Sequence, residues 1–175
     1  MSMRTQAIEI RTPVERDAIA SLRVGDRVLI SGKIYTGRDS VLPKLVELYR
    51  NGGLASQGID LKGSVIFHTA VSPAGVGPTS SNKPEIMDSI PALSGAGVRV
   101  HLGKGRVSAE VIKALDEQGS VYAVMPPVTA LLESKTKGRR IVLFEEYGME
   151  AMHELDVCGY PAIIAAAHGE SIFDE

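Results

Sequence analysis

The sequence contains a single cysteine, no tryptophan and few aromatic residues, which make up 5% of its 175 residues. With Cys158 alone, the chain can form no internal disulfide and no cysteine-based metal or cluster site of its own. Apolar neighbours flank Cys158 within residues 155–159, so we expect a buried structural thiol rather than a reactive one. Any metal-cluster chemistry would need cysteines from a partner chain.

A strong charge imbalance and long apolar runs are also missing. The net charge is −2 with 23% charged residues, and no basic stripe is present, which argues against nucleic-acid binding. No apolar run is long enough to span a bilayer, and residues 1–6 lack the apolar core of a secretory signal. These features predict a cytoplasmic protein that binds neither nucleic acid nor membrane. The length and the 44% hydrophobic content predict a single domain over residues 1–175 with one core.

Strands alternate with helices along the chain. Residues 1–22 are expected to hold an N-terminal strand (7–10) and a short connection. Further strands are predicted at 27–35, 64–68, 98–102, 121–124, 141–144, 152–158 and 161–167, the last two broken at Gly159, Tyr160 and Pro161. Helices are predicted at 42–50 with Asp39 as N-cap, at 108–118, and from Pro126 to Glu133, while 70–81 is expected to be a loop. The alternation predicts an α/β fold with a mixed sheet flanked by helices.

Three short turns with cationic residues are the most informative feature. They are Thr-Gly-Arg-Asp at 36–39, Val-Gly-Pro-Thr-Ser-Ser-Asn-Lys at 76–83 and Gly-Lys-Gly-Arg at 103–106. Each lies where an extended apolar run gives way to a helical pattern. Backbone N–H groups at a helix start favour carboxylates and phosphates. Three such turns therefore predict a converging anion site.

The order of these motifs resembles a known family. The motifs are GKIYTGRD at 32–39, GPTSS at 77–81, GKG at 103–105, EYGMEA at 146–151 and HGES at 168–171. Together they resemble the β subunit, or C-terminal domain, of class I fumarate hydratases and L-tartrate dehydratases. The resemblance runs from about Val24 to the C-terminus.

The resemblance implies a swivelling β/β/α domain that closes over the active site of an α subunit. In that family the α subunit holds a [4Fe–4S] cluster with three cysteines, and the open iron acts as a Lewis acid. Water is added across, or removed from, a carbon–carbon bond next to a carboxylate. We therefore expect an α partner, an α₂β₂ assembly, and fumarate or malate as the default substrate, with tartrate or a related hydroxy acid as alternatives.

The resemblance also implies roles for individual residues. Arg38 and Lys104 match cations that bind the substrate carboxylates, and Thr79 matches a threonine implicated in proton transfer with a partner aspartate. The remaining candidates for substrate binding are Ser80 and Lys83. Simpler interpretations are a local Arg38–Asp39 pair, a helix-capping Thr79 and a solvated Lys104.

The sequence departs from the family pattern at several places. Ser80 replaces a second threonine, and Lys83 replaces an arginine, so that a point charge stands where a bidentate donor is usual. Further departures are Leu42 for a histidine, Pro126-Pro127 for a glycine-rich turn, and Ala166 for an aspartate. These departures bear on which substrate is bound more than on which fold is formed.

The four histidines have no metal-ligand spacing. His101 and His153 are expected to be packed residues, whereas His68 and His168 either line the pocket or make structural hydrogen bonds. The basic run at 135–140 is expected to be a solvated loop, or else to face an acidic patch on a partner.

Two other classes of function remain open. One is a non-catalytic module that binds a carboxylate or phosphate without a partner. The other is an interaction protein whose turns are only helix caps, in which case Arg38, Thr79 and Lys104 would lie far apart.

Overall fold

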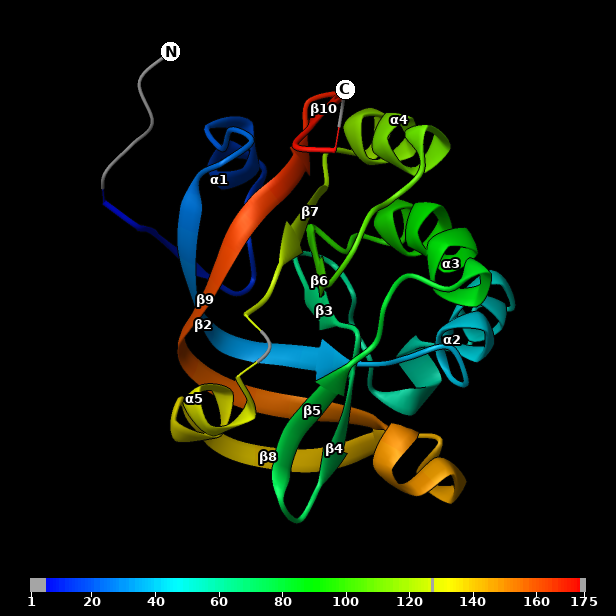
Figure 1. Cartoon of the computed structure of the whole chain (residues 1–175). Helices are drawn as coiled ribbons and strands as arrows, with labels where there is room; N and C mark the ends of the chain where they lie inside the picture. Colours follow the sequence, from blue (N-terminus) through cyan, green and yellow to red (C-terminus); the bar gives the residue numbers. More distant parts are fainter. Residues whose placement is uncertain (1–5, 127, 174–175) are drawn as a thin grey trace.

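The computed structural model describes residues 6–126 and 128–173, and it has a mixed α/β architecture with helices flanking the main sheet (Figure 1). The strands are β1 (Ile8–Arg11), β2 (Arg27–Thr36), β3 (Val65–Phe67), β4 (Thr69–Ser72), β5 (Gly75–Thr79), β6 (Val100–Gly103), β7 (Val121–Val124), β8 (Thr136–Leu143), β9 (Met152–Ala167) and β10 (Glu170–Ser171). The helices are α1 (Arg16–Ala20), α2 (Leu42–Arg50), α3 (Pro84–Gly95), α4 (Ala109–Gln118) and α5 (Thr129–Ser134), with 3₁₀ turns η1 (Ala55–Gln57) and η2 (Glu145–Glu150). The expected mixed sheet with flanking helices is confirmed.

The main sheet curls until it closes on itself. Strands β1, β2, β3, β6 and β7 are parallel neighbours in that order. The long strand β9 runs antiparallel to β7 and also pairs back with β2, which closes a ring of β2, β3, β6, β7 and β9. Strands β8 and β10 add to β9, and β4 and β5 form a separate hairpin.

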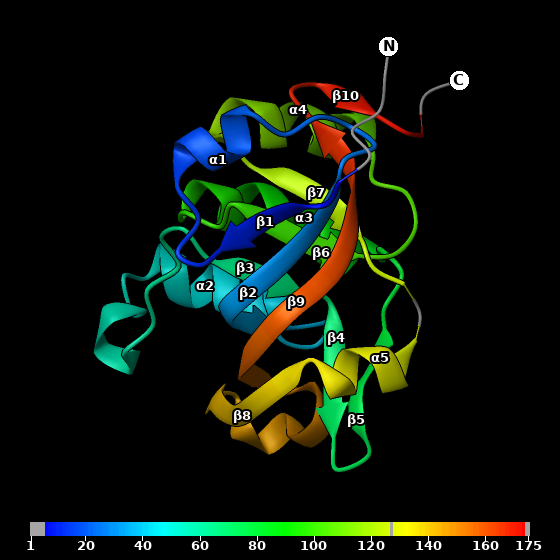
Figure 2. The ribbon, with the colours of Figure 1, turned by 90° about the vertical axis from the view of Figure 1, so that its left-hand side faces the viewer.

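Two hydrophobic clusters fill the two sides of this sheet. Inside the ring, β-branched residues such as Ile30, Val100 and Ile164 pack with Phe67 and are fully buried. On the outer face, α2, α3 and α4 cover the parallel strands, and their apolar stripes form the second cluster (Figures 1 and 2). The stripes arise because apolar residues recur every three or four positions, for example at Leu42, Leu45 and Val46.

Several local predictions were wrong because long-range pairing outweighed local composition. Residues 70–81 are mostly not a loop: β4 and β5 pair as an antiparallel hairpin, in which Gly75 and Gly77 have positive φ. Residues 152–167 form one strand, because β2 pairs with both halves of it and Pro161 lies opposite Leu29.

The same long strand explains three further corrections. Residues 136–140 of the basic run belong to β8, which pairs with β9, and Lys135 caps the end of α5, so the run is not a loop. Because β9 continues through residue 158, Cys158 falls on its outward face and is exposed, not buried. Helix α5 begins at Thr129, so Pro126 precedes it instead of opening it.

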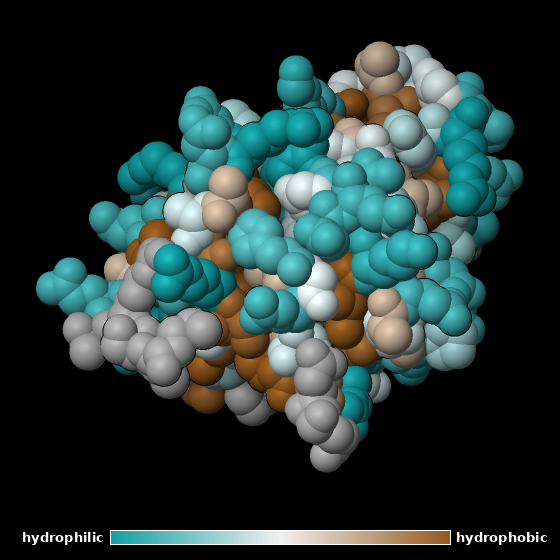
Figure 3. Space-filling model, turned by 90° about the horizontal axis from the view of Figure 1, so that it is seen from above, coloured by the Kyte–Doolittle hydropathy of each residue, from teal (hydrophilic) through white to brown (hydrophobic). Residues whose placement is uncertain are grey.

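Figure 3 views the molecule from the side of α1, β10 and α4, where side chains are mostly hydrophilic and apolar atoms form only narrow strips. Within residues 6–126 and 128–173, no helix combines the length and the apolar character needed to cross a membrane.

Candidate functional site

The three cationic turns lie at one edge of the sheet. The first and third follow the parallel strands β2 and β6, whereas the second belongs to strand β5 of the antiparallel hairpin and the segment after it. Carboxyl ends of parallel strands share an edge, which is where α/β folds place ligands. Backbone hydrogen bonds join the segments: the Gly37 N–H donates to the Phe67 carbonyl at 3.0 Å, and the Ser80 N–H to the His68 carbonyl at 2.8 Å. A parallel β-bridge then links Ser81 to Lys104. The structure thus brings the three turns together, as the sequence predicts for an anion site.

Asp39 links the first turn to the second. Its carboxylate lies 3.8 Å from Arg38 Nε and 3.5 Å from Lys83 Nζ. Asp39 does not cap α2 as expected: the helix begins at Leu42, and its N-cap is Val41, two residues after Asp39. The Asp39 side chain serves instead to hold two cations at the same edge.

The Arg38 guanidinium is only partly satisfied within the described chain. Its Nε is buried and has no hydrogen-bond partner there, because 3.8 Å to Asp39 is too long for a hydrogen bond. A buried donor without an acceptor costs free energy, and such groups in native proteins often mark functional sites. A carboxylate ligand would provide the missing acceptor.

A small cavity of about 110 Å³ lies between the second turn, the third turn and α5; we call it the turn cavity. Its lining residues are Val76, Gly77, Thr79, Lys104, Pro126, Val128, Thr129 and Leu132. Pockets for drug-sized ligands span about 300–1,000 Å³, so this cavity can hold only a small group such as a carboxylate. Thr79 and Lys104, both predicted as site residues, therefore face the same space.

Ser80 lies outside this lining. It is buried, and its hydroxyl donates to the Ser81 carbonyl at 3.0 Å. Lys83 is the N-cap of α3 and is half-exposed. The N-terminal end of α3 adds partial positive charge at this edge.

The histidines take different places. His68 is fully buried directly after β3, and burial lowers its pKa to about 4, an effect that the Asn82 side chain partly opposes. Burial also lowers the pKa of His101, whose Nε2 lies 2.8 Å from Ser94 Oγ. His153 is buried as expected.

His168 does not reach the turns. Its Nε2 bonds the Leu22 carbonyl at 2.8 Å, at the end of β9 beside the amino ends of the parallel strands. Of the two alternatives for His168, the structure therefore favours a structural hydrogen bond.

Asn82 and Tyr122 belong to the same edge, although no sequence motif pointed to Tyr122. The Asn82 Nδ2 donates to the Arg106 carbonyl at 3.0 Å and to Tyr122 Oη at 2.9 Å. The Tyr122 hydroxyl donates to the Gly105 carbonyl at 3.0 Å. Forty residues separate Asn82 from Tyr122. The only signal for this contact in the sequence was the position of Tyr122 on an apolar strand, which predicts that it is buried.

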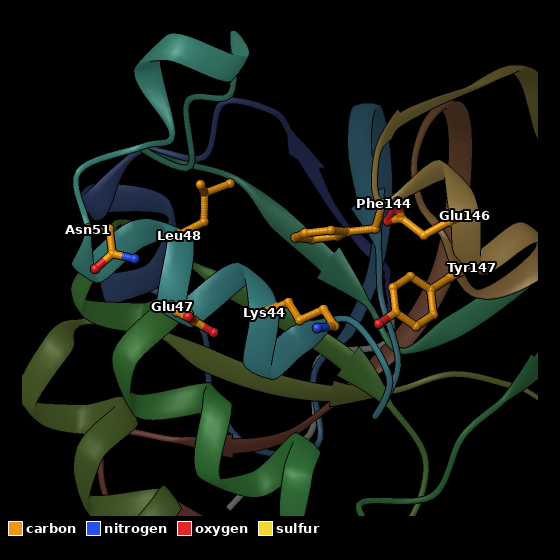
Figure 4. A pocket seen from close by; sticks show the side chains of 7 residues that line it. All are labelled: Lys44, Glu47, Leu48, Asn51, Phe144, Glu146 and Tyr147. Carbon is orange, nitrogen blue, oxygen red and sulfur yellow. The ribbon is translucent and has the colours of Figure 1, made fainter.

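A larger hollow of about 380 Å³ lies between α2 and η2; we call it the helix hollow (Figure 4). Its lining residues are Lys44, Glu47, Leu48, Asn51, Phe144, Glu146 and Tyr147, and the Lys44 ammonium lies 5.7 Å from the centre of the Tyr147 ring. Two glutamates outnumber the single lysine, so the helix hollow has no surplus of positive charge for an anion.

Comparison with known proteins identifies the family of this chain. The family described as Fumarase C-terminus matches residues 1–175, and the chain belongs to this family. Relatives are named as β subunits of L(+)-tartrate dehydratases and as class I fumarate hydratases.

Individual relatives give the extent of the match. A Methanocaldococcus jannaschii protein named "Putative L(+)-tartrate dehydratase subunit beta" is 30% identical over 171 residues, covering 90% of this chain and 86% of the relative. The L(+)-tartrate dehydratase subunit beta of Escherichia coli K12 is 26% identical, with 70% and 63% covered. The anaerobic class I fumarate hydratase of the same strain is 33% identical over 81% of this chain, which spans 27% of that enzyme.

Proposed function

We propose that this chain is the β subunit of a hydro-lyase that adds or removes water on a small hydroxy-dicarboxylate. Fumarate or malate is the default substrate, and tartrate or a related hydroxy acid is the alternative. The observation that carries the proposal is the meeting of three cationic turns at one sheet edge, in a chain whose relatives are named as β subunits.

The charges at this edge suit a dicarboxylate. Arg106 is directed to the Phe173 carbonyl and ring and does not line the turn cavity. Of the other cations in the turns, Arg38, Lys83 and Lys104 supply three positive charges, and Asp39 removes one of them. The surplus of two positive charges matches the two carboxylates of such a substrate. Arg38 provides a planar fork for one carboxylate, and Lys104 a point charge for the other.

Thr79 is the proposed catalytic hydroxyl. A threonine hydroxyl is a weak base near neutral pH, so it needs a neighbouring carboxylate to exchange a proton. The described residues of the turn cavity include no carboxylate. We therefore assign that carboxylate to an aspartate of the partner. Ser80 and Lys83 are proposed to support substrate binding from the same turn.

The residues of this chain do not fit an iron–sulfur cluster. Within the described ranges no three His, Cys, Asp or Glu side chains gather as metal ligands, and Cys158 stands alone and exposed on β9. We therefore assign the [4Fe–4S] cluster to an α partner in an α₂β₂ assembly. This chain would supply no ligand to the cluster. This chain would close over the partner's site as a swivelling domain.

Anaerobic affinity purification of this chain from its native cells tests the proposal. Mass spectrometry and iron analysis should find a stoichiometric, iron-containing partner with three cysteines that can hold a cluster. The complex should interconvert fumarate and malate or dehydrate tartrate. An iron-free chain without a partner that still binds dicarboxylates saturably would contradict catalysis and favour the binding module.

A further inference from the structure

The hydrogen bonds of Asn82 and Tyr122 tie the second cationic turn to the third. Asn82 lies between Thr79 and Lys83, and its amide bonds both the Arg106 carbonyl and the Tyr122 hydroxyl. The same hydroxyl donates to the Gly105 carbonyl, one residue after Lys104. One side chain from each of two distant segments thus bonds the carbonyls of Gly105 and Arg106, the two residues that follow Lys104.

The Tyr122 hydroxyl is well suited to hold this geometry. The residue is fully buried, and burial raises its pKa to about 12, so the hydroxyl stays protonated and donates throughout the neutral range. Its one proton goes to Gly105 while its oxygen accepts from Asn82. Rotating the hydroxyl would break one of the two bonds, so the arrangement has little freedom.

Gly103 makes room for this contact. A Cβ at this position would lie 2.9 Å from His68 Nδ1 and 3.2 Å from Tyr122 Oη, both closer than ordinary packing permits. Gly105 then turns the chain with a φ of +85°, a conformation that L side chains rarely adopt. Gly103 is therefore required because a side chain there would collide with His68 and the Tyr122 hydroxyl, and Gly105 because the turn needs a positive φ.

Lys104 itself needs outside support. Its side chain is exposed and flexible, so its reach is set by where the backbone holds its Cα. A binding group must be held to within about 0.5 Å of its productive position, which requires neighbours that fix it through packing and hydrogen bonds. The single β-bridge to Ser81 fixes only one point of the turn.

We propose that Asn82 and Tyr122 are positioning residues that lock the Lys104 turn against the turn bearing Thr79 and Lys83. This inference rests on the proposed function for its catalytic consequence, but the lock itself is a property of this chain. Neither residue needs to touch the substrate.

The lock is tested first without activity. Tyr122→Phe removes one buried hydroxyl, and Tyr160→Phe removes another, which is equally buried but bonds Thr136 between β8 and β9. Hydrogen exchange of the full chain, followed by mass spectrometry, should accelerate about tenfold in peptides covering 80–83 and 103–106 for Tyr122→Phe only. Equal exchange in both variants at these peptides would overturn the lock.

The second readout is the split between KM and kcat in the assembled enzyme. Tyr122→Phe and Asn82→Ala should each raise KM about tenfold, with a smaller change in kcat, while Tyr160→Phe leaves both within twofold. The double variant should lose less than the product of the single effects, since both remove the same hydrogen bond. A fully multiplicative loss, or equal losses with Tyr160→Phe, would overturn the positioning role.

The two proposals fail in different ways. If exchange accelerates as expected while no partner or hydro-lyase activity is found, the lock stands and the proposed function fails. If the enzyme is active and exchange is unchanged by Tyr122→Phe, the proposed function stands and the lock fails.

Discussion

The turn cavity and the helix hollow both present a lysine to solvent, yet they differ in every property that matters for binding an anion. The helix hollow is more than three times larger, at about 380 Å³ against about 110 Å³. Its lysine, however, faces two glutamates and an aromatic ring. The turns at the same sheet edge as the turn cavity carry two further cations, Arg38 and Lys83, and the buried Nε–H of Arg38 has no hydrogen-bond partner among the described residues.

The difference teaches that size is a poor guide to a site for a small dicarboxylate. Carboxylate recognition needs fixed donors and surplus positive charge, which converging strand ends and a helix start provide. The helix hollow is formed by two surface elements and has neither. Substitutions in the two places should therefore have very different consequences.

The largest expected effect comes from removing the cations of the site. Arg38→Ala in the assembled enzyme should weaken binding of the dicarboxylate by about 2–5 kcal/mol, roughly 30- to 5,000-fold, as truncation of one side of a buried charge pair does. Lys104→Ala should fall near the lower end, because its side chain is exposed in this chain. Steady-state kinetics and binding of a competitive dicarboxylate measure both.

Circular dichroism of these variants provides the stability control. Native-like spectra and melting curves would separate lost binding from lost folding. Effects below tenfold for both substitutions would show that the carboxylates bind elsewhere. The turn cavity would then have no better claim than the helix hollow to be the anion site.

A second prediction concerns pH, because the turn cavity, unlike the helix hollow, lies beside a buried histidine pair. His68 and His101 have ring centres 6.2 Å apart, and burial lowers the pKa of His68 from 6.5 to about 4. The unfolded chain therefore binds protons first as pH falls. Stability is complete above pH 6.5 and declines toward pH 4, by about 1.4 kcal/mol per pH unit for each such histidine.

Urea unfolding at pH 7.5, 6.0 and 5.0 measures this slope. His68→Gln should flatten it by about 2 kcal/mol between pH 7.5 and pH 5.0. A slope that is unchanged in His68→Gln would show that the acid sensitivity does not come from His68.

The sequence predicted the parts of the fold that depend on local patterns. Strands near 27–35, 98–102 and 121–124 and helices near 42–50 and 108–118 match β2, β6, β7, α2 and α4, because period-2 and period-3.6 patterns reflect which face is buried. The β4–β5 hairpin and the continuity of β9 were missed. Glycine and proline look like chain breaks locally, but β2 pairs with β9 on both sides of Gly159, which has a φ of +72° at a shift in the register, and Pro161 lies opposite Leu29.

The site was predictable only in outline. Motifs located the three turns, and the common edge of parallel strands explains why they converge. The contact between Asn82 and Tyr122 was not visible, because the two residues are far apart in sequence and neither belongs to a catalytic motif. Ser80 also shows that a hydroxyl in the right motif can be buried and bonded to its own turn.

A smaller effect is expected from restoring the arginine usual in the family. Lys83 lies 3.5 Å from Asp39, longer than a good charge-assisted hydrogen bond. Lys83→Arg can bond both Asp39 oxygens or a substrate carboxylate in fork geometry, so we expect KM for fumarate or malate to fall roughly two- to fivefold. Lys83→Gln, which removes the charge but keeps an N–H donor, should raise KM. A rise in KM with arginine would instead mark Lys83 as selective for a different hydroxy acid.

The smallest effect is predicted for the helix hollow. Lys44→Ala removes an exposed ammonium and its contact with the Tyr147 ring, which at such a site is worth about 0.5–1 kcal/mol. The melting temperature should therefore fall by only a few degrees, and KM and kcat should stay within twofold of the parent enzyme. Lys44→Ala and Lys104→Ala should be measured under identical conditions, because both lysines are exposed and each variant serves as the control for the other. A loss of activity at Lys44 equal to that at Lys104 would mean that the larger hollow also binds the substrate or its partner, since charge at the two lysines would then matter alike.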